Sequence, residues 1–207
     1  GDNTVLVTSS VGSVTFSHTS GVRLRLIAGQ FGGMGNTTYP SRLSSPAGVV
    51  ADPIGNIYVV ENCRILRIAP NRTMSVFAGS GTCTSTNGTG TGATFNDARG
   101  IDIDGAGNLY VMQSYCLRKI TPAGVVTTLA GSCGASGSTD GTGSAARFFA
   151  SHHAAVDNAG NVYVADSQNY TIRKVTAAGV VTTLAGTVGT AGSTDGTGSA
   201  ALFNHPR

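Results

Sequence analysis

A short sequence of the form Gly-Asn-apolar-Tyr-Val occurs three times in this chain of 207 residues. The copies begin at Gly55, Gly107 and Gly160, at intervals of 52 and 53 residues. A second marker, an Ala-Gly pair after an apolar stretch, keeps the same register, at residues 28–29, 78–79, 130–131 and 185–186. Because two independent markers share one period, the unit that folds is a repeat of about 50 residues.

Each repeat predicts four short strands. In the third repeat they are expected at residues 154–157, 162–165, 171–175 and 180–184, with Gly-containing turns between them. Charged residues make up only 11% of the chain, so the residues that cover exposed helix faces are scarce. Four antiparallel strands per repeat predict an all-β fold, a β-propeller built from four-stranded blades.

The repeats resemble a known family. The third runs from Asp157 through Gly160-Asn161-Val162-Tyr163-Val164 to Arg173-Lys174 and resembles the NHL repeat. The second agrees at Asp104 and Arg118-Lys119, whereas the first has Glu61-Asn62 in place of the usual Asp-Ser. The resemblance implies an NHL-like propeller, a fold used as a binding platform, as an extracellular scaffold and occasionally by metal-dependent lyases or lactonases.

The repeat register divides the chain into four segments. Residues 1–45 are expected to form a partial blade, strands two to four, with a connector, because Asn3 aligns with Asn161. Residues 46–98, 99–152 and 153–207 are each expected to form a blade with its connector. Arg207 aligns with Arg99, immediately before a first strand, so about four blades are present and one first strand is missing.

Three ways of completing the ring stay open. Further sequence could add roughly two blades to give six. Neighbouring copies could complete one another by strand addition and assemble head to tail. Four blades could also close with a three-stranded first blade. Since open strand edges pair readily with other chains, the segment is expected to self-associate when it is expressed alone.

The four cysteines occupy two equivalent places in two repeats. Cys63 and Cys116 lie between strands two and three, whereas Cys83 and Cys133 follow the Ala-Gly pairs. Their joint absence from the third repeat favours Cys63 with Cys83 and Cys116 with Cys133, one of three possible connectivities. A zinc site would need a ligand spacing that is not found here. Disulfides predict an oxidising compartment and therefore an extracellular protein.

Four glycosylation sequons begin at Asn36, Asn71, Asn87 and Asn169. A chain this rich in Ser and Thr acquires some sequons by chance. All four nevertheless fall in expected connectors or turns, where a glycan can be accommodated. Together with the cysteines they predict an extracellular glycoprotein.

Residues that precede first strands line the mouth of the central channel in a propeller. In register these are Ala47, Arg99, His152 and Arg207, with His153 beside them. They could form a polar ring that binds an anionic ligand, or they could be ordinary solvated loop residues. A shared metal at the two histidines is disfavoured, because neighbours on a strand point to opposite faces.

Other motifs favour structural roles. Asp52, Asp104 and Asp157 precede Gly-Asn turns and are expected to accept backbone N–H groups, since the spacing of calcium loops is absent. The runs Ser-Thr-Asp-Gly-Thr-Gly at 138–143 and 193–198 lack the lysine of a phosphate-binding loop and are interpreted as turns. No catalytic residue, metal site or cofactor is predicted.

Charge and hydropathy limit the classes of partner that this chain is expected to bind. The net charge is +3 without a Lys/Arg run, which disfavours nucleic acid. No apolar stretch approaches the length of a membrane span. We expect an extracellular structural or binding scaffold whose partners are further copies, another extracellular protein or a glycan. The alternative is an NHL-type hydrolase or lyase with a metal in the channel.

Overall fold

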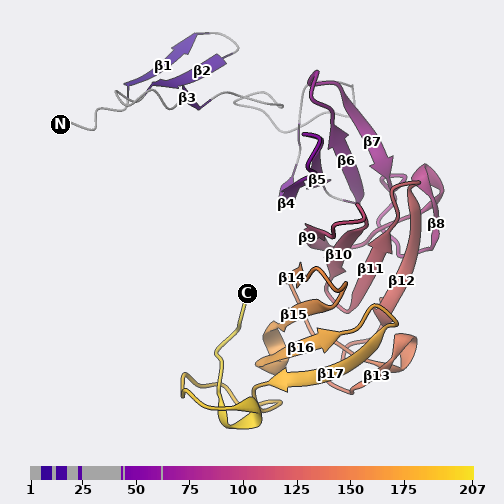
Figure 1. Cartoon of the computed structure of the whole chain (residues 1–207), viewed down its shortest axis with the longest axis vertical. Helices are drawn as coiled ribbons and strands as arrows, with labels where there is room; N and C mark the ends of the chain where they lie inside the picture. Colours follow the sequence, from indigo (N-terminus) through magenta and orange to yellow (C-terminus); the bar gives the residue numbers. More distant parts are fainter. Residues whose placement is uncertain (1–5, 11–12, 18–22, 25–42, 44, 62) are drawn as a thin grey trace.

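The computed structural model describes residues 6–10, 13–17, 23–24, 43, 45–61 and 63–207. These residues form antiparallel sheets joined by turns and short 3-10 helices, and they contain no α-helix. The predicted all-β fold of repeated four-stranded sheets is thus confirmed. The sheets between residues 46 and 185 follow one another along an open arc (Figure 1). Within the described part of the chain, no helix has the length and apolar character needed to cross a bilayer.

The strand boundaries repeat from sheet to sheet. The N-terminal sheet contains β1 (Leu6–Ser10), β2 (Ser13–Ser17) and β3 (Arg23–Leu24). The next contains β4 (Pro46–Ala51), β5 (Ile57–Glu61), β6 (Arg64–Ile68) and β7 (Met74–Ala78). The third contains β9 (Ala98–Ile103), β10 (Leu109–Gln113), β11 (Cys116–Ile120) and β12 (Val125–Gly131). The last contains β14 (His153–Val156), β15 (Val162–Asp166), β16 (Thr171–Val175) and β17 (Val180–Ala185), close to the predicted ranges.

Two of the sheets gain a fifth strand from the preceding connector. β8 (Gly88–Thr89) pairs with β12, and β13 (Gly141–Thr142) pairs with β17. The run at 138–143, interpreted from the sequence as a turn, therefore also supplies an outer strand to the next sheet. The sequence interpretation misses this strand because two residues carry no hydrophobic periodicity.

The N-terminal sheet has three strands, and one register differs from the predicted alignment. Phe16 of β2 lies opposite Leu24 of β3, which matches the pairing of β16 with β17 in the predicted alignment. Ser17, however, lies opposite Leu6, whereas the alignment predicts Thr4 at that place. In the sequence two residues separate β1 from β2, whereas four residues separate β15 from β16.

The turn aspartates act as the sequence predicts. Asp157 Oδ1 accepts the backbone N–H groups of Ala159 (2.9 Å) and Asn161 (2.8 Å), and its Oδ2 accepts a hydrogen bond from the Asn161 amide. Asp52 and Asp104 repeat this arrangement. The hydrogen bonds from Asn161 lower the pKa of Asp157, because they stabilise the carboxylate. These side chains hold the hairpin between the first two strands of each blade.

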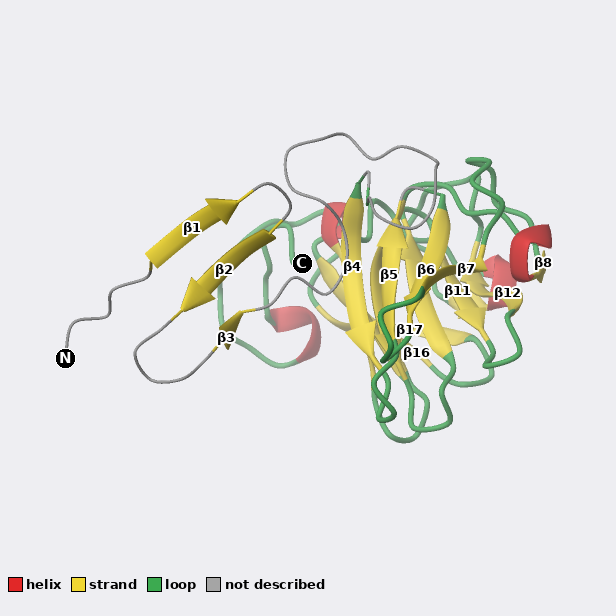
Figure 2. Ribbon diagram, turned by 90° about the horizontal axis from the view of Figure 1, so that it is seen from above, coloured by secondary structure: helices red, strands yellow, loops and turns green. Residues whose placement is uncertain are grey.

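The hydrophobic core lies between successive sheets. Val60 and Ile65 pack with Val111 and Ile120 of the following sheet in one cluster. A second cluster joins Met112 and its neighbours to Val162, Val164 and Val175 of the last sheet. In Figure 2 the strands β4, β5, β6 and β7 stand side by side as one such layer. Each sheet is thus buried against the next, and a sheet at the end of the stack leaves one apolar face uncovered.

The innermost strands β4, β9 and β14 lie on the concave side of the arc (Figure 1). Gly48 of β4 and Gly100 of β9 allow these strands to approach closely. A Cβ on Gly100 would lie 2.6 Å from the carbonyl oxygen of His152, and one on Gly48 would collide with the carbonyl oxygen of Arg99. The close approach brings the residues that precede each inner strand to one place.

Candidate functional site

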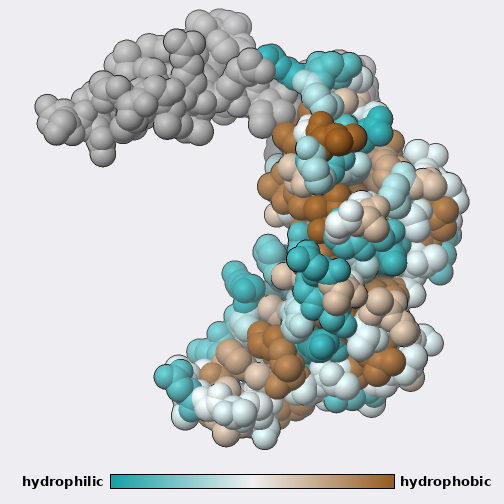
Figure 3. All heavy atoms as spheres, viewed as in Figure 1, coloured by the Kyte–Doolittle hydropathy of each residue, from teal (hydrophilic) through white to brown (hydrophobic). Residues whose placement is uncertain are grey.

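A polar depression lies where the inner strands begin. One cavity of about 220 Å³ is lined by the five residues that the sequence places at the channel mouth: Ala47, Arg99, His152, His153 and Arg207. They come from β4, β9, the start of β14 and the end of the chain, so only the stacking of sheets brings them together. Hydrophilic residues are visible on the concave side of the arc (Figure 3). We call these five residues the mouth cluster.

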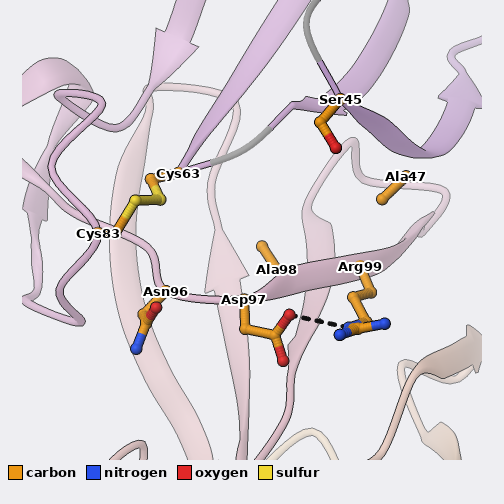
Figure 4. Close-up of a pocket in the computed structure, with 8 residues that line it drawn as sticks. All are labelled: Ser45, Ala47, Cys63, Cys83, Asn96, Asp97, Ala98 and Arg99. Atoms are coloured by element: carbon orange, nitrogen blue, oxygen red, sulfur yellow. Dashed lines mark hydrogen bonds and ion pairs between the residues drawn. A yellow bond between two sulfur atoms is a disulfide. The ribbon is translucent and has the colours of Figure 1, made fainter.

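A second cavity, of about 370 Å³, shares Ala47 and Arg99 with the first. Its remaining lining residues are Ser45, Cys63, Cys83, Asn96, Asp97 and Ala98. The disulfide between Cys63 and Cys83 forms part of its wall, and the Asp97 carboxylate faces the Arg99 guanidinium (Figure 4). The two cavities therefore share an arginine that is paired with a carboxylate, and a disulfide forms part of the wall of the larger cavity.

Arg99 is held by Asp97 through Nε, with 2.9 Å between Nε and Oδ1. The other carboxylate oxygen of Asp97 accepts a hydrogen bond from the Ser114 hydroxyl. This ion pair leaves the terminal guanidinium nitrogens of Arg99 without a partner among the described residues. Because both side chains are about half exposed, the pair orients the guanidinium but contributes little to stability.

His152 has a ring nitrogen that is unsatisfied among the described residues. Its side chain is partly buried, and Nδ1 has no hydrogen-bond partner in the described part of the chain. Burial lowers the pKa of His152, and the positive charges of Arg99 and Arg207 lower it further. These effects favour the neutral imidazole, which lines the same cavity as the two arginines. An anion placed there would satisfy both guanidinium groups.

The histidines do not extend into a metal-binding constellation among the described residues, which contain no group of three or more His, Cys, Asp or Glu side chains suited to an ion. His152 is partly buried and its neighbour His153 is exposed. This difference is the one expected for adjacent residues at the start of a strand.

Two buried arginines, at sites that sequence reasoning missed, hold the blades together. Arg173 of β16 has no exposed surface and contacts the connector that precedes its sheet. Its guanidinium bonds to Asp166 Oδ2 (2.9 Å) and Asp140 Oδ1 (2.6 Å), and to the carbonyl oxygens of Thr139 and Arg147 (3.1 Å each). It also stacks on a phenylalanine ring of this connector, with 5.4 Å between Cζ and the ring centroid.

Arg118 of β11 makes the same contacts one blade earlier. It donates to the carbonyl oxygens of Thr86 (2.9 Å) and Thr94 (3.3 Å) and to Asn87 Oδ1 (3.0 Å), and it stacks on Phe95 at 5.4 Å. Among the described residues its side-chain partners are neutral, and burial lowers its pKa to about 10. The sequence signal for both sites is an arginine in the middle of a short apolar strand. We call this arrangement of arginine, connector and phenylalanine ring the arginine clamp.

The structure contains two disulfides, Cys63–Cys83 and Cys116–Cys133, which are the pairs favoured by the repeat. The paired cysteines are 20 and 17 residues apart in the sequence. Each joins the hairpin between the second and third strands of a blade to the connector that leaves the same blade. No described cysteine is free.

The sequons lie in different environments. Asn71 and Asn87 are exposed, and Asn36 lies outside the described residues. Asn169, expected at the surface, is only 6% exposed, so that expectation is wrong. Its amide nitrogen donates to the carbonyl oxygen of Gly137 and to Asp166 Oδ2, both at 2.8 Å. Both hydrogens of the Asn169 amide are thus used in hydrogen bonds. The position of Asn169 between two strands of the sequence does not predict these bonds.

Comparison with known proteins supports the fold. No family model matches the chain, and no curated protein sequence does. A solved auxiliary nutrient binding protein from Bacteroides thetaiotaomicron is similar over 93% of this chain and 46% of its own, with 18% identity and a TM-score of 0.68. A protein of unknown function from the same organism is similar over 96% of this chain and 48% of its own, with 24% identity and a TM-score of 0.67.

A third similar structure is virginiamycin B lyase from Staphylococcus aureus, with 14% identity and a TM-score of 0.53 over 87% of this chain and 50% of the lyase. At these identities the likeness shows the fold alone, which is that of a β-propeller. The NHL family itself is matched by no family model. The chain spans about half the length of these solved structures, in agreement with the open arc of its sheets.

Proposed function

We propose that this protein is an extracellular, propeller-type binding scaffold that takes a small anionic group, a carboxylate, phosphate or sulfate, at the mouth cluster. The observation that carries the proposal is the meeting of Arg99, Arg207 and the unpartnered Nδ1 of His152 around one cavity. Asp97 neutralises Arg99 through one nitrogen only, and Arg207 has no carboxylate partner among the described residues. Positive charge therefore exceeds negative charge at the cavity.

The chemistry of the cluster favours binding over catalysis. Guanidinium groups bind planar or tetrahedral oxyanions through paired N–H donors. An oxyanion beside His152 would raise the pKa of the imidazole, because it stabilises the protonated form. The ring then becomes a third cationic donor to the bound anion. Nothing in the described residues favours the alternative, a hydrolase or lyase with a metal in the channel.

The location and partners form part of the same proposal. The two disulfides support an oxidising, extracellular environment, and the exposed sequons at Asn71 and Asn87 can carry glycans. The anionic group would belong to a glycan, to another extracellular protein or to a small molecule.

Isothermal titration of the full chain with sulfate tests the proposal, because sulfate keeps its charge between pH 5 and 8. We expect Arg99→Gln and Arg207→Gln each to weaken sulfate binding about fivefold, equivalent to ~1 kcal/mol, the upper end for exposed ion pairs. Acetate serves as the carboxylate probe. Arg67→Gln is the matched control, because Arg67 is exposed on β6 and lines neither cavity.

The pH dependence gives a second readout. Since an anion raises the pKa of His152, sulfate should bind more tightly as the pH falls through that pKa, and His152→Gln should remove this dependence. Equal affinities for Arg67→Gln and the two mouth variants would refute the proposal, as would the absence of any binding heat.

A further inference from the structure

The connector that follows the last sheet, residues 186–207, has the conformation of the two connectors before it. Its Gly186 N–H donates to the carbonyl oxygen of Gly198 (3.1 Å), just as Gly79 donates to Gly90 (3.0 Å). It contains a residue of positive φ, His205 at 50°, where the earlier connectors have Asp97 at 51° and Ala150 at 49°. No described sheet packs on the outer side of this connector, so its shape is preformed.

The earlier connectors show what this shape binds. Each presents two backbone carbonyl groups, a side-chain oxygen and a phenylalanine ring to the clamp arginine of the next blade. In the repeat register the corresponding groups of the last connector are the carbonyls of Thr194 and Leu202, the carboxylate of Asp195 and the ring of Phe203. The two carbonyls are already positioned, because Leu202 N–H donates to the Thr194 oxygen at 2.9 Å, the distance between Arg147 and Thr139.

These groups lack the partner that their equivalents have. Phe95 and Phe148 are completely buried under the clamp arginines, whereas Phe203 is only partly buried. Asp195 is exposed and makes no ion pair with the described residues, whereas its equivalent Asp140 pairs with Arg173 at 2.6 Å. The site therefore has an unpaired carboxylate and an uncovered ring where an arginine binds at both preceding junctions.

The adjoining face of the last sheet is also uncovered. Tyr163, Ala165, Ile172 and Ala185 are partly buried. Their equivalents in the previous sheet, Tyr110, Met112, Leu117 and Ala130, are 0–1% exposed beneath the following blade. Apolar residues are visible at the surface of the lower sheet in Figure 3. This face and the last connector together form one surface, which we call the terminal surface.

We propose that the terminal surface docks a further blade of the same repeat type whose third strand carries an arginine at the clamp position. The guanidinium would stack on Phe203, donate to the carbonyls of Thr194 and Leu202, and pair with Asp195. The blade's apolar face would cover Tyr163 and the residues around it. The inference does not depend on the ligand proposed for the mouth cluster.

The clamp position also distinguishes between possible occupants. In the two other sheets of this chain the equivalent residues are Thr15, at the centre of β2, and Leu66, at the centre of β6. Neither can supply a guanidinium to Asp195. A second copy docking its leading sheet, or this chain's own first sheet, would therefore leave the carboxylate unpaired. The similar solved propellers are about twice as long as this chain, which leaves room for further blades in an assembly of this kind.

A fusion protein tests the proposal with the full chain intact. A second copy of residues 153–207, which brings its own clamp arginine, is joined directly after Arg207. Hydrogen exchange of the amides in residues 186–207 is then compared between the fusion and the original chain. We expect exchange at least tenfold slower in the fusion. Asp195→Asn should reverse this protection by fivefold or more in the fusion and change exchange less than twofold in the original chain.

Replacing the clamp arginine of the appended copy by leucine, together with Asp166→Asn in that copy, gives a blade of the Leu66 type without a buried unpaired carboxylate. With this appended blade, Asp195→Asn should leave the hydrogen exchange of residues 186–207 unchanged. The matched control is Lys174→Gln in the appended copy; with that blade, Asp195→Asn should still speed up the exchange. An equal effect of Asp195→Asn in all backgrounds would overturn the proposal. Protection of residues 186–207 that increases with concentration of the unfused chain would also overturn it, in favour of a second copy as the occupant.

Discussion

Replacing Arg173 by leucine should destabilise the protein by about 3–5 kcal/mol, the usual cost of removing one partner from a buried ion pair. The variant keeps an apolar side chain at the junction, as Leu66 does in β6. It leaves Asp166, which has no exposed surface, without its guanidinium. The remaining bonds to Asp166 come from the Ser151 hydroxyl, the Asn169 amide and one backbone N–H, all neutral donors.

The loss should depend on pH. Burial raises the pKa of Asp166, against the lowering effect of its hydrogen bonds and of Arg173, and removal of the guanidinium raises the pKa further. A carboxyl group whose pKa is higher in the folded than in the unfolded state loses stabilising free energy as the pH rises through the folded-state pKa. The penalty of Arg173→Leu is therefore smallest in acid and grows toward pH 7.

Urea denaturation between pH 4 and 7 measures both effects. The double variant Arg173→Leu/Asp166→Asn should recover part of the loss, because no buried charge remains. Arg118→Leu is the matched comparison: its described side-chain partners are neutral, so we expect a smaller loss of about 1–3 kcal/mol, the cost of an unsatisfied buried acceptor. A loss below ~1 kcal/mol for Arg173→Leu, or one independent of pH, would refute the reasoning.

Three further predictions follow from the same structure. Non-reducing peptide mapping should recover both disulfides as local pairs, and their reduction should cost about 2–4 kcal/mol each in urea denaturation. In a secreting eukaryote, mass spectrometry before and after glycosidase treatment should find glycan on Asn71 and Asn87 and none on buried Asn169. Burial, with the hydrogen bond to Asp104, raises the pKa of Tyr110 to about 12, so ultraviolet titration should show a late-titrating phenol whose pKa falls toward 10 in Asp104→Asn. This tyrosine stabilises the fold below pH 10, and that contribution is lost as the pH rises through 12.

Much of this fold could be predicted from the sequence because its determinants are local. The Gly-Asn turns, the aspartates that accept their N–H groups and the strands around them lie within a few residues of one another. The same turns and strands occur in three repeats, so the equivalent residues could be aligned without a structure. The two disulfide pairs belong to the same class, since each closes a short loop within one repeat.

The mouth cluster was predicted as a list of residues, but not as a site with particular charges. Its electrostatic character depends on the ion pair of Arg99 with Asp97 and on the partial burial of His152. The ion pair joins residues only two apart in the sequence. The burial of His152, in contrast, accompanies the close approach of Gly100 to its backbone, a distance set by packing between sheets that the order of residues within a sheet does not specify.

The sequence by itself determined the repeat, the strand pattern and the residues that meet at the ends of blades. Only the tertiary structure decided which polar groups are buried. Arg173 bonds to Asp140, 33 residues away, and Asn169 bonds to Gly137, 32 residues away, across the junction between two blades. An arginine in a short strand and an asparagine in a turn are exposed in most contexts. Here the connector that precedes the sheet covers them, and a buried polar group must then find its partners there.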